Sequence, residues 1–210
     1  MSYVEVSNVS KKYKDRMLVD NVSFSVEKGE ILGIVGLNGS GKTVMLKCIC
    51  GLMEYNSGTI KVNDKIIGKE KEYPDNMGVI IETPGFLPYY SGYKNLEYLA
   101  SLRNKISKQD IKDVLVKVGL GGEEKKLVAK YSLGMKQRLG IAQAIMEAPE
   151  FLILDEPMNG LDKDGIAEVR KLLLEMKEQG KTMIITSHNE EDIKVLCDKV
   201  IEMDKGKIEV

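Results

Sequence analysis

Hydrophobic and polar residues alternate along the first third of the chain. Residues 4–6 and 22–26 place valine or phenylalanine at every second position, which is typical of strands with one buried face. Residues 31–35 are instead an almost unbroken apolar run, as in a strand that is covered on both faces. A short helix over residues 42–50 and a hairpin over residues 58–67 complete the elements predicted for this part.

The middle of the chain has helical periodicity. Leucines recur at helical spacing over residues 96–102, and apolar residues do so over residues 111–118, after a serine cap at Ser107. Another helix is predicted over residues 132–148, because Pro149 prevents its continuation.

From residue 151 onward, strands and helices alternate. Three apolar runs predict strands and two intervening segments predict helices, over residues 151–154, 164–179, 182–186, 190–197 and 200–203. Such alternation is typical of an α/β fold with a mostly parallel core sheet and helices on both of its faces. No linker interrupts the chain, so the helical middle is interpreted as an insertion in one compact unit.

Composition narrows the class of protein. The chain has 210 residues, 31 Lys and Arg against 32 Asp and Glu, and a net charge of -1, which excludes the broad basic field of a nucleic-acid coat protein. No apolar run approaches the ~20 residues needed to cross a bilayer, and the N-terminus has no secretory signal. Cys48 and Cys50 lack the nearby ligands of a metal site. We therefore expect a cytoplasmic protein with reduced thiols, buried or inert at Cys48 and Cys50, and no nucleic-acid partner.

Residues 36–43, Gly-Leu-Asn-Gly-Ser-Gly-Lys-Thr, match the phosphate-loop pattern G-x-x-x-x-G-K-[ST] between a predicted buried strand and a helix. In such a loop, backbone N–H groups surround the phosphates, the lysine reaches the β- and γ-phosphates and the hydroxyl binds Mg²⁺. The alternative is a glycine-rich turn with a solvated lysine. The predicted nucleotide-binding residues are Gly36, Asn38, Gly39, Ser40, Gly41, Lys42 and Thr43.

A second acidic motif follows the strand at residues 151–154. Asp155 stands where a carboxylate would hold Mg²⁺ through water, together with Thr43. Glu156 comes next and could act as general base toward the attacking water. The alternative for both residues is a solvated acidic turn after a buried strand.

With these motifs in place, nearly the whole chain resembles the ATP-binding cassette (ABC) family. Residues 131–138, Tyr-Ser-Leu-Gly-Met-Lys-Gln-Arg, are similar to the family's signature, although Leu133 and Met135 depart from it; a serine N-cap at Ser132 is compatible with that role. Residues 159–162 resemble the D-loop. His188, the chain's only histidine, resembles the switch histidine that contacts the γ-phosphate.

The resemblance also covers Tyr13, which stands where the family has the aromatic residue that stacks on adenine; packing on a strand edge is the alternative. It implies one ABC domain over residues 1–210, with an N-terminal antiparallel β portion. The nucleotide-binding core would comprise about 1–85 and 150–210, and a helical insertion about 86–149.

The mechanism implied by the resemblance is a head-to-tail dimer of two identical chains, with ATP between the subunits. Ser132 and Gly134 would contact the γ-phosphate that the other subunit binds, and Asp162 would lie at the dimer interface. Lys42, Glu156 and His188 would be catalytic. ATP and Mg²⁺ are the expected cofactors.

Glu82 departs from the glutamine that the family usually carries after its strand. A carboxylate cannot donate the amide hydrogen bond and adds negative charge near Mg²⁺, so Glu82 is predicted at the metal and in coupling; an exposed acidic residue before a turn is the alternative. Residues 81–92 resemble the bacitracin- and lantibiotic-immunity branch of ABC exporters. There the partner is a separate membrane permease, which would hold this chain at the inner face of the cell membrane and could contact Tyr89, Tyr90 and Tyr93.

The leading hypothesis is thus an ABC transporter ATPase that powers export of antimicrobial peptides or related compounds. A soluble ABC ATPase of DNA repair or translation is an alternative, but those relatives usually have a long coiled-coil insertion or two cassettes in one chain. A P-loop kinase of small molecules is a further alternative that leaves the signature and D-loop unexplained.

Overall fold

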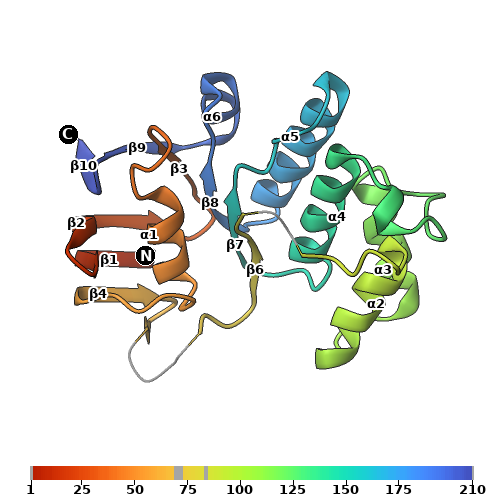
Figure 1. Ribbon diagram of the computed structural model, residues 1–210, viewed down its shortest axis with the longest axis horizontal. Coiled ribbons are helices and arrows are strands. Elements are labelled where there is room, and N and C mark those ends of the chain that lie inside the picture. The colour runs from red at the N-terminus through yellow and green to blue at the C-terminus, as the bar shows by residue number, and fades with distance from the viewer. Residues whose placement is uncertain (1, 69–72, 83–84, 210) are drawn as a thin grey trace.

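The computed structural model describes residues 2–68, 73–82 and 85–209, and its centre is a six-stranded sheet (Figure 1). The strand order is β10-β9-β3-β8-β7-β6, in which the five strands from β9 to β6 run parallel and β10 pairs with β9 in the antiparallel sense. The strands are β3 (Ile31–Val35), β6 (Met77–Ile80), β7 (Phe151–Asp155), β8 (Thr182–Thr186), β9 (Lys199–Asp204) and β10 (Lys207–Glu209). The mostly parallel core sheet is therefore confirmed.

A second sheet is antiparallel and built from the N-terminal part of the chain. Its order is β2-β1-β4-β5, with β1 (Ser2–Tyr13), β2 (Arg16–Glu27), β4 (Ser57–Val62) and β5 (Lys65–Ile67). The two long strands β1 and β2 form a hairpin whose register shifts at several bulges. This sheet is the predicted antiparallel β portion, and β4 with β5 is the predicted hairpin.

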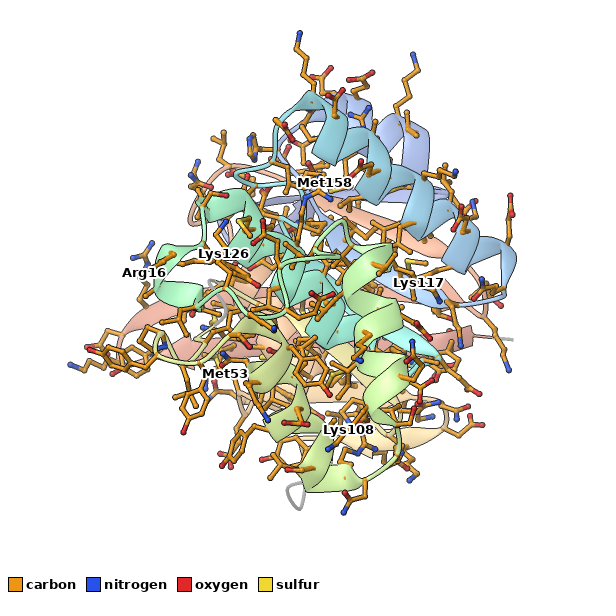
Figure 2. All side chains as sticks on the ribbon, turned by 90° about the vertical axis from the view of Figure 1, so that its right-hand side faces the viewer. Arg16, Met53, Lys108, Lys117, Lys126 and Met158 are labelled. Carbon is orange, nitrogen blue, oxygen red and sulfur yellow. The ribbon has the colours of Figure 1, made fainter. Side chains whose placement is uncertain are left out.

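The helices fall into two groups. Three of them alternate with strands of the core sheet: α1 (Lys42–Ile49), α5 (Lys163–Glu178) and α6 (Glu190–Leu196). The others lie together beyond the edge strand β6: α2 (Gly92–Arg103), α3 (Lys108–Lys117), a 3-10 turn (Val128–Lys130) and α4 (Leu133–Ile145) (Figure 1). Figure 2 looks onto this second group, with Lys108 and Lys117 at the two ends of α3. None of the helices in the described part of the chain has the length and apolar character to span a membrane.

The core sheet separates two hydrophobic cores. Along β7, Leu152 and Leu154 pack with α4 and α5 on one face, whereas Phe151 and Ile153 pack with α1 and the antiparallel sheet on the other. The same division holds along β3, where Ile31 and Leu32 face opposite cores. Burial on both faces explains why these strands are continuous apolar runs in the sequence.

The start of α3 agrees with the prediction, and the end of α4 does not. Ser107 and Asp110 form the complete capping box expected at the start of α3. Helix α4, however, ends at Ile145 rather than at Ala148, so the predicted end was wrong by three residues. Ala148 has a left-handed backbone with φ of 51° and precedes Pro149, whose ring disfavours helical geometry in the residue before it.

The three cysteines lie in the protein interior or close to it. Cys48 and Cys50 are fully buried around the end of α1, and burial raises the pKa of the first thiol to about 11 and of the second to about 12. Cys197, half-buried after α6, also has its pKa raised to about 12 by burial. The expected burial of Cys48 and Cys50 is confirmed.

Because the thiolate is the reactive species, we expect the folded protein at pH 8 to react with a thiol-specific disulfide reagent at least about tenfold more slowly than the unfolded chain. Absorbance of the released reagent measures this, with guanidinium-unfolded protein as the control. Fast reaction of one or more thiols in the folded state would contradict the burial.

The free energy of unfolding should also fall as pH rises from about 9 toward 11, because the unfolded chain releases thiol protons that the folded chain retains.

Candidate nucleotide-binding site

The phosphate loop joins β3 to α1 and is held tightly against two other segments of the backbone. Gly36 has a φ of 139°, and a Cβ atom there would lie 2.1 Å from the carbonyl oxygen of Met203 at the end of β9. Gly41 has a φ of 109°, and a Cβ atom there would lie 2.7 Å from the carbonyl oxygen of Leu18 in β2. Only glycine fits at either position. The backbone of the loop is thus fixed by its neighbours.

Lys42 and Ser40 carry the polar groups of this loop. Lys42 is 7% exposed, and its ammonium group donates hydrogen bonds to the carbonyl oxygens of Gly36 at 2.6 Å and Leu37 at 3.1 Å. The buried Ser40 hydroxyl has no hydrogen-bond partner within the described ranges. Gly39 has open space on the side where a Cβ atom would lie, and Asn38 is exposed. An unpartnered hydroxyl beside a lysine and a helix N-terminus fits a phosphate group.

Two threonine hydroxyls converge on the Asp155 carboxylate at the carboxyl end of β7. Thr43, at the start of α1, donates to Oδ2 of Asp155 at 2.8 Å, and Thr186, at the end of β8, donates to Oδ1 at 2.6 Å. The predicted pair Thr43 and Asp155 is therefore brought together from positions 112 residues apart. Hydroxyl and carboxylate oxygens are the ligands that Mg²⁺ prefers, so the donor set fits this ion.

Glu156 follows immediately and faces His188. The carboxylate oxygen Oε2 of Glu156 lies 2.8 Å from Nδ1 of His188 and accepts a longer hydrogen bond, at 3.4 Å, from the His188 backbone N–H. Glu156 has a left-handed backbone with φ of 50°, and its N–H donates to the Thr186 hydroxyl at 2.9 Å. The His188 side chain is largely exposed, whereas that of Glu156 is mostly covered. A carboxylate and an imidazole in contact beside a phosphate loop can accept and hold a water proton.

The phosphate loop, Asp155 and Glu156 line a hollow of about 530 Å³, whereas Thr186 and His188 contact the two carboxylates from outside its wall. Its wall includes residues 38–44, Asp155 and Glu156, and also two cations that the motifs do not contain, Arg16 at the start of β2 and Lys205 in the β9–β10 turn. The sequence carries no spacing signal for these two residues, since each reaches the hollow through the folding of a distant hairpin. Their charges suit a polyphosphate.

Tyr13 lies in the hairpin that carries Arg16. The two residues face each other in register beside the β1–β2 turn, and Tyr13 is 63% exposed, with the Lys14 ammonium 5.8 Å from the ring centre. Tyr13 is not part of the wall of the hollow. It is available to stack on a base beyond the phosphates, and this role stays a prediction.

The signature and D-loop residues lie at two helix N-termini and do not line the hollow. Ser132 caps α4 by accepting a hydrogen bond from the Met135 N–H at 3.2 Å, so the N-cap prediction is confirmed. Asp162 caps α5 in the same way, accepting from the Gly165 N–H at 3.1 Å. Gly134 packs next to Gly160. A chain's own signature is thus separate from its own phosphate loop.

Glu82 follows β6 and has a left-handed backbone with φ of 60°. Its carboxylate forms an ion pair at 2.7 Å with Lys47 of α1, and its side chain is 65% exposed. It does not line the hollow that holds Asp155. Within residues 81–92, Thr83 and Pro84 lie outside the described residues.

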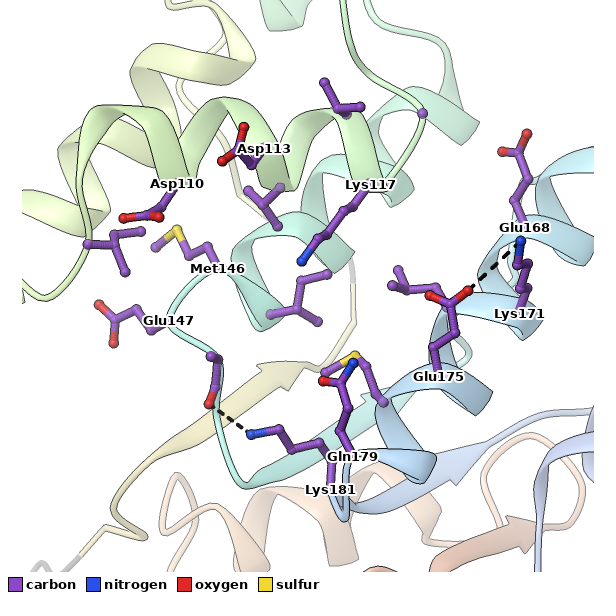
Figure 3. Close-up of a pocket in the computed structure, with 18 of the residues that line it drawn as sticks. Asp110, Asp113, Lys117, Met146, Glu147, Glu168, Lys171, Glu175, Gln179 and Lys181 are labelled. Atoms are coloured by element: carbon purple, nitrogen blue, oxygen red, sulfur yellow. Dashed lines mark hydrogen bonds and ion pairs between the residues drawn. The ribbon is translucent and has the colours of Figure 1, made fainter.

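A larger hollow of about 800 Å³ lies elsewhere, between α3, the end of α4 and α5 (Figure 3). None of the motif residues lines it. Several acidic groups around it are already paired: Glu147 with Arg103, Glu168 with Arg138 and Glu175 with Lys171. The groups that suit a phosphate and Mg²⁺, namely the phosphate loop and the Thr43–Asp155 pair, lie at the 530 Å³ hollow instead.

Comparison with known proteins now identifies the family. The model of the ABC transporter family matches residues 19–159. The chain belongs to the ABC transporter family. It is an ATP-binding and ATP-hydrolysing cassette, and this membership excludes the small-molecule kinase alternative.

Relatives of the cassette support this assignment. It is 45% identical over 206 residues to the uncharacterized ABC transporter ATP-binding protein YybJ of Bacillus subtilis, covering 98% of this chain and 94% of the relative. It is 42% identical to the bacitracin transport ATP-binding protein BcrA of Enterococcus faecalis, covering 99% and 68%, and 37% identical to the lantibiotic transport ATP-binding protein SrtF of Streptococcus pyogenes, covering 98% and 88%.

The fold is that of a solved cassette. A dimeric structure of the ATP-binding cassette MJ0796 in a post-hydrolysis state, bound to ADP and Pi, superimposes with a TM-score of 0.90 at 22% identity, covering 99% of this chain and 97% of that one. The P-loop NTPase fold predicted from the sequence is therefore confirmed.

Thr186 offers a test of the site, because its hydroxyl bridges Asp155 and the Glu156 N–H. We expect Thr186→Val to lower kcat for ATP hydrolysis at least about tenfold by releasing both groups. Thr182→Val is the matched control: this buried hydroxyl at the other end of β8 accepts from the Gly29 N–H at 2.9 Å, so its loss should cost similar stability and leave kcat unchanged. Phosphate release and thermal unfolding measure the two effects. Equal kcat losses in both variants would contradict the assignment.

Proposed function

We propose that this cassette is the ATP-hydrolysing motor of an exporter of antimicrobial peptides or related compounds, acting with a separate membrane permease and serving self-immunity or resistance. The observation that supports the motor role is the convergence of the phosphate loop, Asp155, Glu156 and His188 at one edge of the core sheet. The names of BcrA and SrtF, which are bacitracin and lantibiotic transport proteins, support the peptide class of substrate.

In this proposal the residues of one chain bind and orient the triphosphate. Lys42 exchanges its two carbonyl contacts for the β- and γ-phosphates, while Gly36, Asn38, Gly39, Ser40, Gly41 and Thr43 surround them. Thr43 and Asp155 would hold Mg²⁺, which supplies positive charge that offsets the charge developing on the transferred phosphoryl group. Glu156 takes the proton of the attacking water at its carboxylate, and His188 orients that carboxylate. Tyr13 stacks on the base.

A second copy of the chain completes the site. The N-terminus of α4, with Ser132 and Gly134, carries the partial positive charge of its helix and is exposed to solvent. Because it lies apart from its own phosphate loop, it can contact the γ-phosphate held by another copy in a head-to-tail dimer. Asp162, which caps α5 beside the D-loop, would lie at that interface.

The solution mass of Glu156→Gln with and without Mg-ATP tests this proposal. Removing the base should trap ATP and shift the mass from one chain of 23.4 kDa to twice that value by light scattering. Adding Ser132→Asp should abolish the shift, because aspartate is an equally good N-cap but repels the phosphate. Ser107→Asp, a matched change at the N-cap of α3, should leave the dimer intact. A mass that stays at one chain with ATP bound would contradict the shared site.

We further propose that residues 1–210 form one cassette whose helical insertion, about 86–149, contacts the permease at the membrane's inner face. The tyrosine segment supports this: Tyr89 is 85% exposed and Tyr90 53%, and with Tyr93 they line an apolar hollow of about 460 Å³. Exposed aromatic residues of this kind are typical of protein interfaces. Glu82, between this segment and the sheet, would transmit the state of the nucleotide and, once released by Lys47, contribute charge near Mg²⁺.

Glu82→Gln tests the coupling role. We expect cells carrying this variant with the native permease to lose protection against the exported peptide by at least about fourfold, while ATP binding by the isolated cassette stays within about twofold, since Glu82 does not line the nucleotide hollow. Growth inhibition and nucleotide titration measure the two effects. Lys47→Met is the companion variant, because it removes the ion-pair partner of Glu82 and leaves the negative charge of the Glu82 carboxylate in place. Unchanged protection with Glu82→Gln would contradict the proposal.

A further inference from the structure

The backbone of Glu156 is held in an unfavourable conformation by contacts from two sides. Its φ of 50° lies in the left-handed region, which a non-glycine residue adopts only when its surroundings impose it. On the amino side, its N–H donates to the Thr186 hydroxyl at 2.9 Å. On the carboxyl side, its carbonyl oxygen accepts a hydrogen bond from Nε2 of Gln137 at 3.2 Å. The direction of the Glu156 side chain depends on both restraints.

Gln137 makes a second contact of the same kind. Its Nε2 also donates to the carbonyl oxygen of Pro157 at 3.0 Å, so one side-chain amide holds two successive peptide groups. Gln137 lies in the second turn of α4, the helix that begins at the cap Ser132. A side chain of the signature helix therefore reaches the residue that carries the base.

The start of α4 also contacts Gly160, in the loop after β7 that carries Glu156 and Pro157, at two points. A Cβ atom on Gly134 would lie 2.9 Å from the carbonyl oxygen of Gly160, and one on Gly160 would lie 2.6 Å from Cγ of Leu133. Backbone packing this close leaves little freedom for the two segments to move independently. The first two turns of α4 and residues 156–160 thus form one packed unit, which we call the base clasp.

We propose that Gln137 is a positioning residue for hydrolysis: it fixes the Glu156 backbone and links the helix end at Ser132 to the base of its own chain. The first part needs only the ATPase activity of the cassette. The second part rests on the proposed head-to-tail dimer, because there the γ-phosphate bound by one copy meets the α4 N-terminus of the other. Binding at one site would then set the base at the other site through the base clasp.

ATPase kinetics of Gln137→Met test the first part. This change keeps length and volume but removes the donor, so we expect kcat to fall at least about tenfold while KM for ATP stays within about twofold. Gln143→Met is the matched control on the same helix, where Gln143 lines a separate hollow beside β6 and α2, and it should leave kcat unchanged. Gln137→Glu, which also lacks a donor and keeps the polarity of this half-buried position, serves as the second variant if the methionine variant does not fold.

A double-mutant cycle separates positioning from a merely structural role. If Gln137 acts through Glu156, then Gln137→Met should cost little or nothing in a Glu156→Gln background, where the base is already absent. A loss of the same factor in both backgrounds, or a kcat within about twofold of the parent, would overturn the proposal. If Glu156→Gln fails to dimerise with ATP while the cycle shows full coupling, the shared site is wrong and the positioning role holds.

Discussion

The phosphate loop packs closely against the backbone of β9 and of β2, and the geometry of the site depends on these contacts. Gly36 fits against Met203, Gly41 against Leu18, and the Gly206 N–H donates to the carbonyl oxygen of Ser40 at 2.8 Å. These contacts join β9, the β9–β10 turn and the antiparallel sheet to one short loop. The same contacts bring Arg16 and Lys205 to the hollow, so the loop's position and the site's charge have one cause.

The topology of the core sheet supplies the rest of the chemistry. Parallel strands β7 and β8 end at the same edge, next to the loop that follows β3, so Asp155, Thr186 and Thr43 meet there. Each carboxylate oxygen of Asp155 has a hydroxyl partner, and the same Thr186 hydroxyl holds the next peptide N–H. Glu156 is thereby tied to the Asp155 carboxylate through one threonine. A conformational strain at Glu156 persists because neighbouring elements impose it.

The sequence was sufficient wherever one local pattern determined the result. The buried run at residues 31–35, the glycines of the phosphate loop and the serine caps at Ser107 and Ser132 each follow from a few adjacent residues. The P-loop fold and the pairing of Thr43 with Asp155 followed from motif order.

Other features depend on contacts between distant segments and carry no local signal. Arg16, at the start of β2, and Lys205, in the β9–β10 turn, belong to no sequence motif. The end of α4 was misplaced because the left-handed conformation of Ala148 has no sequence marker beyond Pro149. The ion pair of Glu82 with Lys47 and the reach of Gln137 to Glu156 likewise require the folded arrangement of α1, α4 and the loop after β7.

Mixing two inactive variants tests the shared nucleotide site most directly. Lys42→Ala loses its own phosphate loop but keeps Ser132, whereas Ser132→Asp keeps the loop and loses the contribution to the other copy. We predict that each variant alone has little ATPase activity and that an equimolar mixture exceeds both, at up to about a quarter of the parent rate. Half of the random pairs contain one complete site of two, and the base of that site acts without ATP at the other site to set it. A mixture that stays as inactive as its components, with both variants folded and Ser132→Asp still binding ATP, would contradict the account.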